Sequence, residues 1–96
     1  MKIPRTMEIS GYTLEIVYKD KIMVDGQECF GYYDTVKKQI ALVKGMSPAR
    51  KKEIFLHEFC HFLEDIYRIH ISHEGIASIA LGFVQLLNNK KVKWNG

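Results

Sequence analysis

The chain of 96 residues has the size of one compact domain. Apolar residues make up 47% of it and charged residues 26%, a balance that is typical of globular proteins and excludes a disordered chain. The net charge of +3 comes from scattered lysines and arginines without interleaved aromatic residues, which argues against nucleic-acid binding.

The number of cysteines and the distribution of apolar residues indicate the cellular compartment. Cys29 and Cys60 are too few for a disulfide framework. The N-terminus shows no charged-then-apolar leader, and no apolar stretch approaches the roughly 18 residues that a membrane span requires. We therefore expect a cytoplasmic protein with no membrane partner, whose oligomeric state the sequence leaves open.

The first half of the chain predicts strands separated by turns. Residues 7–18 alternate with the period of a strand, and Ser10-Gly11 interrupts them where a tight turn is expected. Residues 19–28 are polar and contain the turn signal Asp25-Gly26, so we expect a loop there.

Two further strands are expected before the helical half. Residues 29–33 and 39–43 are rich in strand-forming types, and the polar residues 34–38 between them predict a hairpin. The first half should therefore form a small, mainly antiparallel sheet of three to four strands.

The second half predicts two helices. Ser47-Pro48 supplies an N-cap followed by proline in the first helical position, and a helix is expected over residues 48–67. Ser72 is positioned to cap a second helix over residues 73–88, which Asn88-Asn89 would end. The short connection makes the helices neighbours, so the expected fold is a single α+β domain with two packed helices after the sheet.

The first predicted helix carries His57-Glu58-Phe59-Cys60-His61, the pattern His-Glu-x-x-His. Two imidazoles four residues apart share a helix face, with Cβ atoms about 5–6 Å apart. That separation suits two nitrogens that bind one zinc ion at roughly 2.0–2.1 Å each. Glu58 points about a quarter-turn away, where it can act on a water at the metal without binding the metal.

The rest of this helix also favours a metal. Its apolar residues form one broad face nearly opposite the two histidines, so the helix should be buried on several sides: Phe55, Phe59, Phe62, Leu63 and Ile66. Polar groups in such a helix need partners, because burying them unpaired costs roughly 1–3 kcal/mol each. Zinc would satisfy both imidazoles; alternatively, carbonyl groups or water satisfy two ordinary core histidines. Cys60 is expected to be a small packing residue.

A catalytic zinc usually has three protein ligands and one open position. Glu74 stands at the start of the apolar second helix, on one face with Ser78 and Gln85, and is the favoured third ligand if that face is aimed at the first helix. The alternative is that Glu74 only complements the positive end of its own helix, which is worth about 0.3–1 kcal/mol.

Other side chains compete for roles at this site. His70 and His73 are rivals of Glu74 as the third ligand, although each is more often an ordinary surface histidine. A histidine that is not a ligand, or else Tyr32 or Tyr33, can stabilise a developing oxyanion. The sequence leaves these alternatives open.

The pattern resembles the gluzincin metallopeptidases and, more narrowly, the small ImmA/IrrE-type metallopeptidases and the minigluzincins. The likeness rests on His57 to His61, on Glu74 thirteen positions later in an alanine- and leucine-rich helix, and on residues 31–42 as the sheet before the motif. It implies that His57, His61 and Glu74 bind zinc, that Glu58 is the general base and that one strand pairs with extended substrate. Ser78 stands where many gluzincins carry an acidic residue that supports a ligand histidine.

The favoured hypothesis is therefore a gluzincin-type zinc metalloendopeptidase with a minimal zincin-like fold, which hydrolyses a protein or peptide substrate. A second hypothesis is a non-catalytic or latent zinc-binding regulatory module that keeps the peptidase fold. In a third, the basic tail lays Trp94 into the cleft and holds the enzyme latent. The sequence identifies neither the substrate nor its cleavage specificity.

Overall fold

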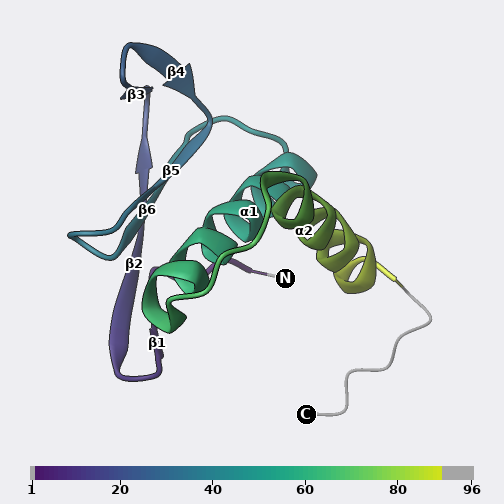
Figure 1. The fold of residues 1–96 in the computed structure, drawn as a ribbon. Helices are drawn as coiled ribbons and strands as arrows, with labels where there is room; N and C mark the ends of the chain where they lie inside the picture. Colours follow the sequence, from purple (N-terminus) through teal and green to yellow (C-terminus); the bar gives the residue numbers. More distant parts are fainter. Residues whose placement is uncertain (1, 90–96) are drawn as a thin grey trace.

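The computed structural model, which describes residues 2–89, consists mainly of a four-stranded sheet, a helix packed on it and a second helix packed on the first (Figure 1). The strands lie in the order β1 (Thr6–Ile9), β2 (Tyr12–Lys19), β6 (Gln39–Val43) and β5 (Gly31–Asp34). A separate two-stranded sheet joins β3 (Ile22–Val24) to β4 (Gln27–Cys29). The helices are α1 (Pro48–Tyr67) and α2 (His73–Leu87). This architecture confirms the predicted α+β fold with a mainly antiparallel sheet and two packed helices.

The strand pairing leaves β5 at an edge of the sheet. β1 pairs antiparallel with β2 and β5 pairs antiparallel with β6, whereas β2 and β6 run parallel. The parallel pair requires a crossover, which the β3–β4 hairpin and β5 supply. Because β5 pairs only with β6 in the four-stranded sheet, its other side has no strand partner there.

The tight turn predicted at Ser10-Gly11 is confirmed. Ser10 has a φ of 51° and Gly11 a φ of 82°, so both central residues are left-handed, as a two-residue hairpin turn between β1 and β2 requires. Gly11 reaches this region without steric cost because it has no Cβ.

The loop predicted for residues 19–28 is wrong. This segment contains β3 and most of β4, which pair antiparallel around the turn that Asp25-Gly26 does form. Each strand has only three residues, too few to show a period, and their pairing supplies the backbone hydrogen bonds that hold them. The single strand predicted for residues 29–33 is interrupted at Phe30, so Cys29 ends β4 and Gly31 begins β5.

The core lies between the sheet and α1. Side chains from β2, β5, β6 and α1 form one buried cluster: Leu14, Ile16, Tyr33, Ile40, Leu42, Phe55 and Phe62. Phe59, Leu63 and Ile66 of the predicted apolar face pack against this cluster, and Cys60 is buried, as expected of a packing residue. The apolar residues of α1 therefore pack the helix against the sheet, and this packing fixes the position of the histidine motif.

Both predicted N-caps are confirmed, and they decide where the two helices begin. The Ser47 hydroxyl accepts a hydrogen bond from the Arg50 backbone N–H at 3.2 Å, and the Ser72 hydroxyl accepts one from the Gly75 N–H at 3.0 Å. α1 ends at Tyr67, and its C-cap Arg68 has a left-handed φ of 55°, which stops the helix. α1 packs against β5 and β6 on one side and against α2 on another (Figure 1). Within residues 2–89, neither helix has the length and apolar character of a membrane crossing.

Gly31 allows β5 to approach α1 closely. A Cβ at this position would lie 2.5 Å from Ile54 Cγ2 and 3.3 Å from Glu58 Cγ. The side chain of Ile54 is branched at Cβ and cannot easily turn away, so the strand and the helix would have to separate. The absence of a side chain at Gly31 therefore sets the distance between β5 and the helix face that bears Glu58.

We expect Gly31→Ala to lower the free energy of unfolding by about 1–3 kcal/mol, the usual cost of overpacking. Gly82→Ala is the matched control, because a Cβ on Gly82 of α2 would meet nothing within 4 Å. The control should be unchanged or up to about 1 kcal/mol more stable, since alanine favours a helix interior. Urea titration of both variants measures the difference, and equal stabilities would contradict the proposed close approach.

Candidate metal and catalytic site

His57 and His61 lie one turn apart on α1, and the first residue of α2 joins them. The ring centroids of His57 and His61 are 5.2 Å apart, and those of His57 and His73 are 5.4 Å apart. The structure thus brings together three imidazoles from two helices. Of the two rival histidines considered from the sequence, His73 is at this cluster, whereas the His70 side chain is 91% exposed.

The donor chemistry of the His57–His61 pair fits zinc. Two imidazole nitrogens at roughly 2.0–2.1 Å from one tetrahedral zinc place their ring centroids about 5 Å apart. The observed separation of 5.2 Å agrees with that value. His73 does not complete a three-ligand group with this pair, since no group of three or more His, Cys, Asp or Glu side chains among the described residues is placed to hold a metal ion.

Glu74, the favoured third ligand, lies one residue beyond His73 on the first turn of α2. Its side chain is exposed and makes no hydrogen bond or ion pair with any of residues 2–89. Ser78 and Gln85, which share its predicted face, are exposed as well, and α2 buries Ile76 and Ala80 instead. The assignment of Glu74 as a zinc ligand stays a prediction.

The side chain of Glu58 extends from α1 toward β5 and is half-buried. Burial raises the pKa of its carboxyl group, while the charges of His61 and His73 and a hydrogen bond from the Tyr33 backbone N–H oppose that shift. A carboxylate with a raised pKa takes up a proton more readily near neutral pH, which is what a general base must do. Burial, followed by the charges of the neighbouring histidines, lowers the pKa of His57, so its imidazole is predominantly neutral at neutral pH.

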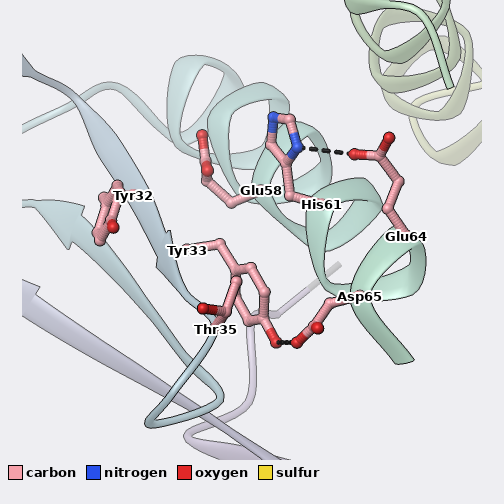
Figure 2. Close-up of a pocket in the computed structure, with 7 residues that line it drawn as sticks. All are labelled: Tyr32, Tyr33, Thr35, Glu58, His61, Glu64 and Asp65. Carbon is pink, nitrogen blue, oxygen red and sulfur yellow. Dashed lines mark hydrogen bonds and ion pairs between the residues drawn. The ribbon is translucent and has the colours of Figure 1, made fainter. Parts of the chain in front are cut away.

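Glu64 belongs to the site although it lies outside the His-Glu-x-x-His motif. Its Oε1 lies 2.8 Å from Nδ1 of His61 (Figure 2). Its Oε2 accepts the Ile71 backbone N–H at 2.9 Å. These contacts, first the Ile71 N–H and then His61, hold the pKa of Glu64 below its usual value. A sequence signal existed, because a residue three positions after His61 lies on the same helix face.

A cavity of about 440 Å³ opens between β5 and α1 (Figure 2). It is lined by residues of the strand, its following turn and the motif helix: Tyr32, Tyr33, Thr35, Glu58, His61, Glu64 and Asp65. The Tyr33 hydroxyl donates a hydrogen bond to Asp65 at 2.6 Å, so it is already engaged. Of the two tyrosines considered as oxyanion donors, Tyr32 has the more exposed side chain.

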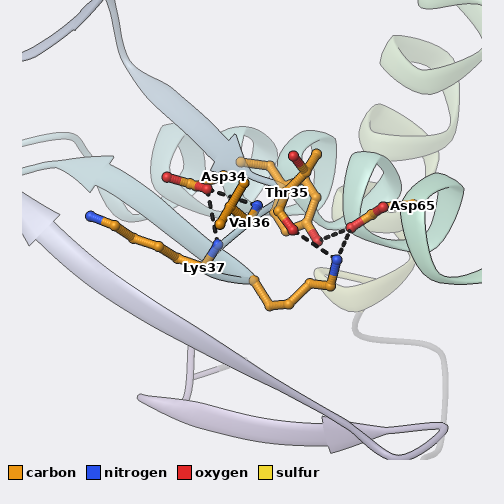
Figure 3. A network of polar contacts seen from close by, with 7 residues as sticks. Asp34, Thr35, Val36, Lys37 and Asp65 are labelled. Atoms are coloured by element: carbon orange, nitrogen blue, oxygen red, sulfur yellow. Dashed lines mark hydrogen bonds and ion pairs between the residues drawn. The ribbon is translucent and has the colours of Figure 1, made fainter.

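A polar network fastens the β5–β6 turn to α1 at one end of this cavity (Figure 3). Lys38 Nζ lies 2.7 Å from Asp65 Oδ2 and donates to the Thr35 carbonyl at 2.7 Å. Asp34 Oδ1 accepts the backbone N–H groups of Val36 and Lys37 at 2.9 and 3.0 Å, which shapes the turn. The network therefore holds the strand that lines the cavity against the helix that carries the histidines.

We expect Asp65→Asn to cost about 1.5–3 kcal/mol of stability at neutral pH, as hydrogen bonds to a charged group typically contribute. The hydrogen bond from Lys38, followed by that from Tyr33, lowers the pKa of Asp65 in the folded protein. Its stabilising contribution is therefore present above the unfolded pKa of about 3.9 and is lost as the pH falls through the lower folded pKa.

Unfolding of wild type and variant between neutral pH and about pH 2.5 tests this expectation, and the difference should shrink toward the acid end. Asp20→Asn is the control, because Asp20 is 91% exposed and its ion pair with Lys44 spans 3.4 Å. A constant difference across the whole pH range would contradict the role of the Asp65 charge.

No protein-family model, curated protein or solved structure matches this chain. The likeness to gluzincins therefore depends on the motif residues themselves. The side chains that the fold brings together are therefore the basis for inferring a function.

Proposed function

We propose that this protein is a zinc-dependent metallopeptidase that hydrolyses peptide bonds in a protein or peptide substrate. The observation that carries the proposal is the separation of 5.2 Å between the centroids of the His57 and His61 rings, beside a half-buried Glu58 whose partial burial raises its pKa. Imidazole pairs at this spacing suit zinc, and an adjacent carboxylate that does not bind the metal suits proton transfer. Glu58 and His61 line a cavity large enough for a substrate side chain.

In this proposal His57 and His61 hold the metal, and the first turn of α2 supplies the third donor. Glu74 is that donor by resemblance to gluzincins, whereas His73 is favoured by its distance of 5.4 Å from the His57 ring. Zinc, when bound, polarises the substrate carbonyl and lowers the pKa of water at the site. Glu58 takes the proton from the attacking water and passes it to the leaving amine.

The position of β5 supports an extended substrate. One edge of β5 has no partner strand within the four-stranded sheet, and the Tyr33 N–H hydrogen-bonds toward Glu58. A peptide added along this edge would make backbone hydrogen bonds with β5 and pass beside the general base. Main-chain pairing of this kind recognises extended conformation, and the adjoining cavity would receive a side chain.

Zinc content measured by metal mass spectrometry in wild type, Glu74→Ala and His73→Ala tests the metal site. We expect about one zinc per chain in the wild type. A clear loss in one variant only identifies the third donor. No zinc in the wild type, even after refolding in its presence, would return His57 and His61 to the class of ordinary half-buried histidines and overturn the peptidase proposal.

A non-catalytic zinc-binding regulatory module is the second candidate. The observation that favours it is the engagement of the Tyr33 hydroxyl with Asp65, which removes one oxyanion donor from the cavity. Incubating the zinc-loaded protein with a mixed peptide library, followed by mass spectrometry, separates the two: cleavage supports the enzyme, and intact peptides at full zinc occupancy support the module.

The third hypothesis, a latent enzyme whose tail blocks the cleft, concerns residues 90–96, which lie outside the described residues.

A further inference from the structure

Glu64 uses its two carboxylate oxygens for two different parts of the chain. Oε1 lies 2.8 Å from Nδ1 of His61, on the same helix, and Oε2 accepts the backbone N–H of Ile71 at 2.9 Å. The Glu64 side chain is only 17% exposed, so water competes weakly for these contacts. His70 Nδ1 lies 3.8 Å from the same Oε2 and adds a weaker contact from the connecting segment.

The contact with His61 selects one form of its ring. An ionised carboxylate only accepts hydrogen bonds, so the proton of a neutral His61 ring must sit on Nδ1. The lone pair is then on Nε2, the nitrogen free to bind a metal. Carboxylate partners of this kind orient metal-binding histidines and raise their basicity.

The contact with Ile71 acts on the other half of the site. Ile71 immediately precedes Ser72, the N-cap of α2, and α2 begins with His73 and Glu74. The Glu64 backbone carbonyl also accepts the Ile69 N–H at 3.2 Å. Residue 64 therefore holds the short connection at two points, and the position of both candidate third donors depends on that connection.

We infer that Glu64 is a positioning residue that couples the two halves of the metal site. It holds His61 in the Nδ1–H form and fixes the start of α2 relative to α1. Its effect on zinc rests on the proposed function, whereas its effects on the His61 ring and on the connection hold in the metal-free protein. Glu64 acts through these groups without touching the reacting atoms.

Three variants test the inference: Glu64→Ala removes both contacts, Glu64→Gln keeps an acceptor oxygen, and Glu53→Gln is a control on the same helix. The Glu53 side chain is 42% exposed and pairs with Arg50, at the other end of α1 from the α1–α2 connection. In the metal-free protein, ¹⁵N NMR of the histidine rings reports the His61 tautomer, and amide hydrogen exchange reports the protection of Ile71. Competition with a chelator then measures the dissociation constant for zinc.

We expect the wild type and Glu53→Gln to show His61 as the Nδ1–H form with a protected Ile71 amide. Glu64→Ala should show mixed tautomers, faster exchange at Ile71 and zinc affinity weakened by about 10–100-fold. Glu64→Gln should fall between the two, and it provides the comparison if Glu64→Ala does not fold. An unchanged tautomer together with unchanged exchange at Ile71 in a folded Glu64 variant would overturn the inference.

The readouts separate this inference from the proposed function. If the wild type binds no zinc, the peptidase proposal fails while the tautomer and exchange measurements still decide the role of Glu64. If the wild type binds zinc and folded Glu64 variants bind it equally well, the metal site stands and its coupling through Glu64 is refuted.

Discussion

Glu58→Gln is expected to retain zinc and to lower the rate of peptide hydrolysis by about 10²–10⁴-fold, the usual contribution of a general base. The amide matches the carboxylate in shape but cannot take a proton from water. Because burial raises the pKa of Glu58, the folded protein disfavours its charged form, and the neutral amide should not lower stability. Loss of hydrolysis would then reflect chemistry and not unfolding.

The decisive measurement combines zinc content, thermal unfolding and initial cleavage rate on one preparation. Glu8→Gln is the control, since it makes the same chemical change at an exposed position on β1. Cleavage by Glu58→Gln at the wild-type rate would remove Glu58 from the mechanism while leaving the metal site intact. Loss of both zinc and activity would instead assign Glu58 to the metal.

His57→Ala is expected to abolish stoichiometric zinc binding and the stability that zinc confers. A ligand that binds only the folded state stabilises it by about 2.7 kcal/mol when its free concentration is one hundred times its dissociation constant. If zinc binds to His57 and His61 in the folded protein, it should raise the melting temperature of the wild type substantially. In the variant that rise should disappear.

Thermal unfolding of wild type and His57→Ala, each with zinc and with chelator, measures this linkage. His70→Ala is the matched control, because its imidazole is 91% exposed and lies outside the His57–His61–His73 cluster. The two variants should differ in the presence of zinc much more than in chelator. An equal zinc-dependent rise in His57→Ala and wild type would show that zinc binds elsewhere.

Local patterns account for the elements that the sequence predicted correctly. Ser47 and Ser72 are N-caps because their hydroxyls satisfy backbone N–H groups within three residues, and this needs no distant partner. The Ser10-Gly11 turn and the strand over residues 39–43 were likewise evident from neighbouring residues. The apolar stripe of α1 correctly indicated which face packs on the sheet, since a helix repeats at a fixed angle.

Features that leave no repeating pattern in the sequence, or that depend on distant contacts, were missed. β3 and β4 form a local hairpin, but strands of three residues are too short to show a period, and the sequence suggested a loop. Nothing in the neighbouring sequence shows that Gly31 must be a glycine. The requirement arises only because β5 packs against Ile54, which leaves no room for a Cβ. The parallel pairing of β2 with β6 depends on the path of the residues between them.

At the candidate site, too, some features follow from the local sequence and others from the tertiary structure. The sequence by itself determined that His57 and His61 share a face with Glu58 beside them, because one turn of helix brings residues four apart together whatever surrounds it. Only the tertiary structure decided that His73 approaches His57 while Glu74 is exposed, and that Glu64 joins His61 to Ile71. Those positions depend on how the connection between α1 and α2 folds back, and neighbouring residues alone do not specify that path.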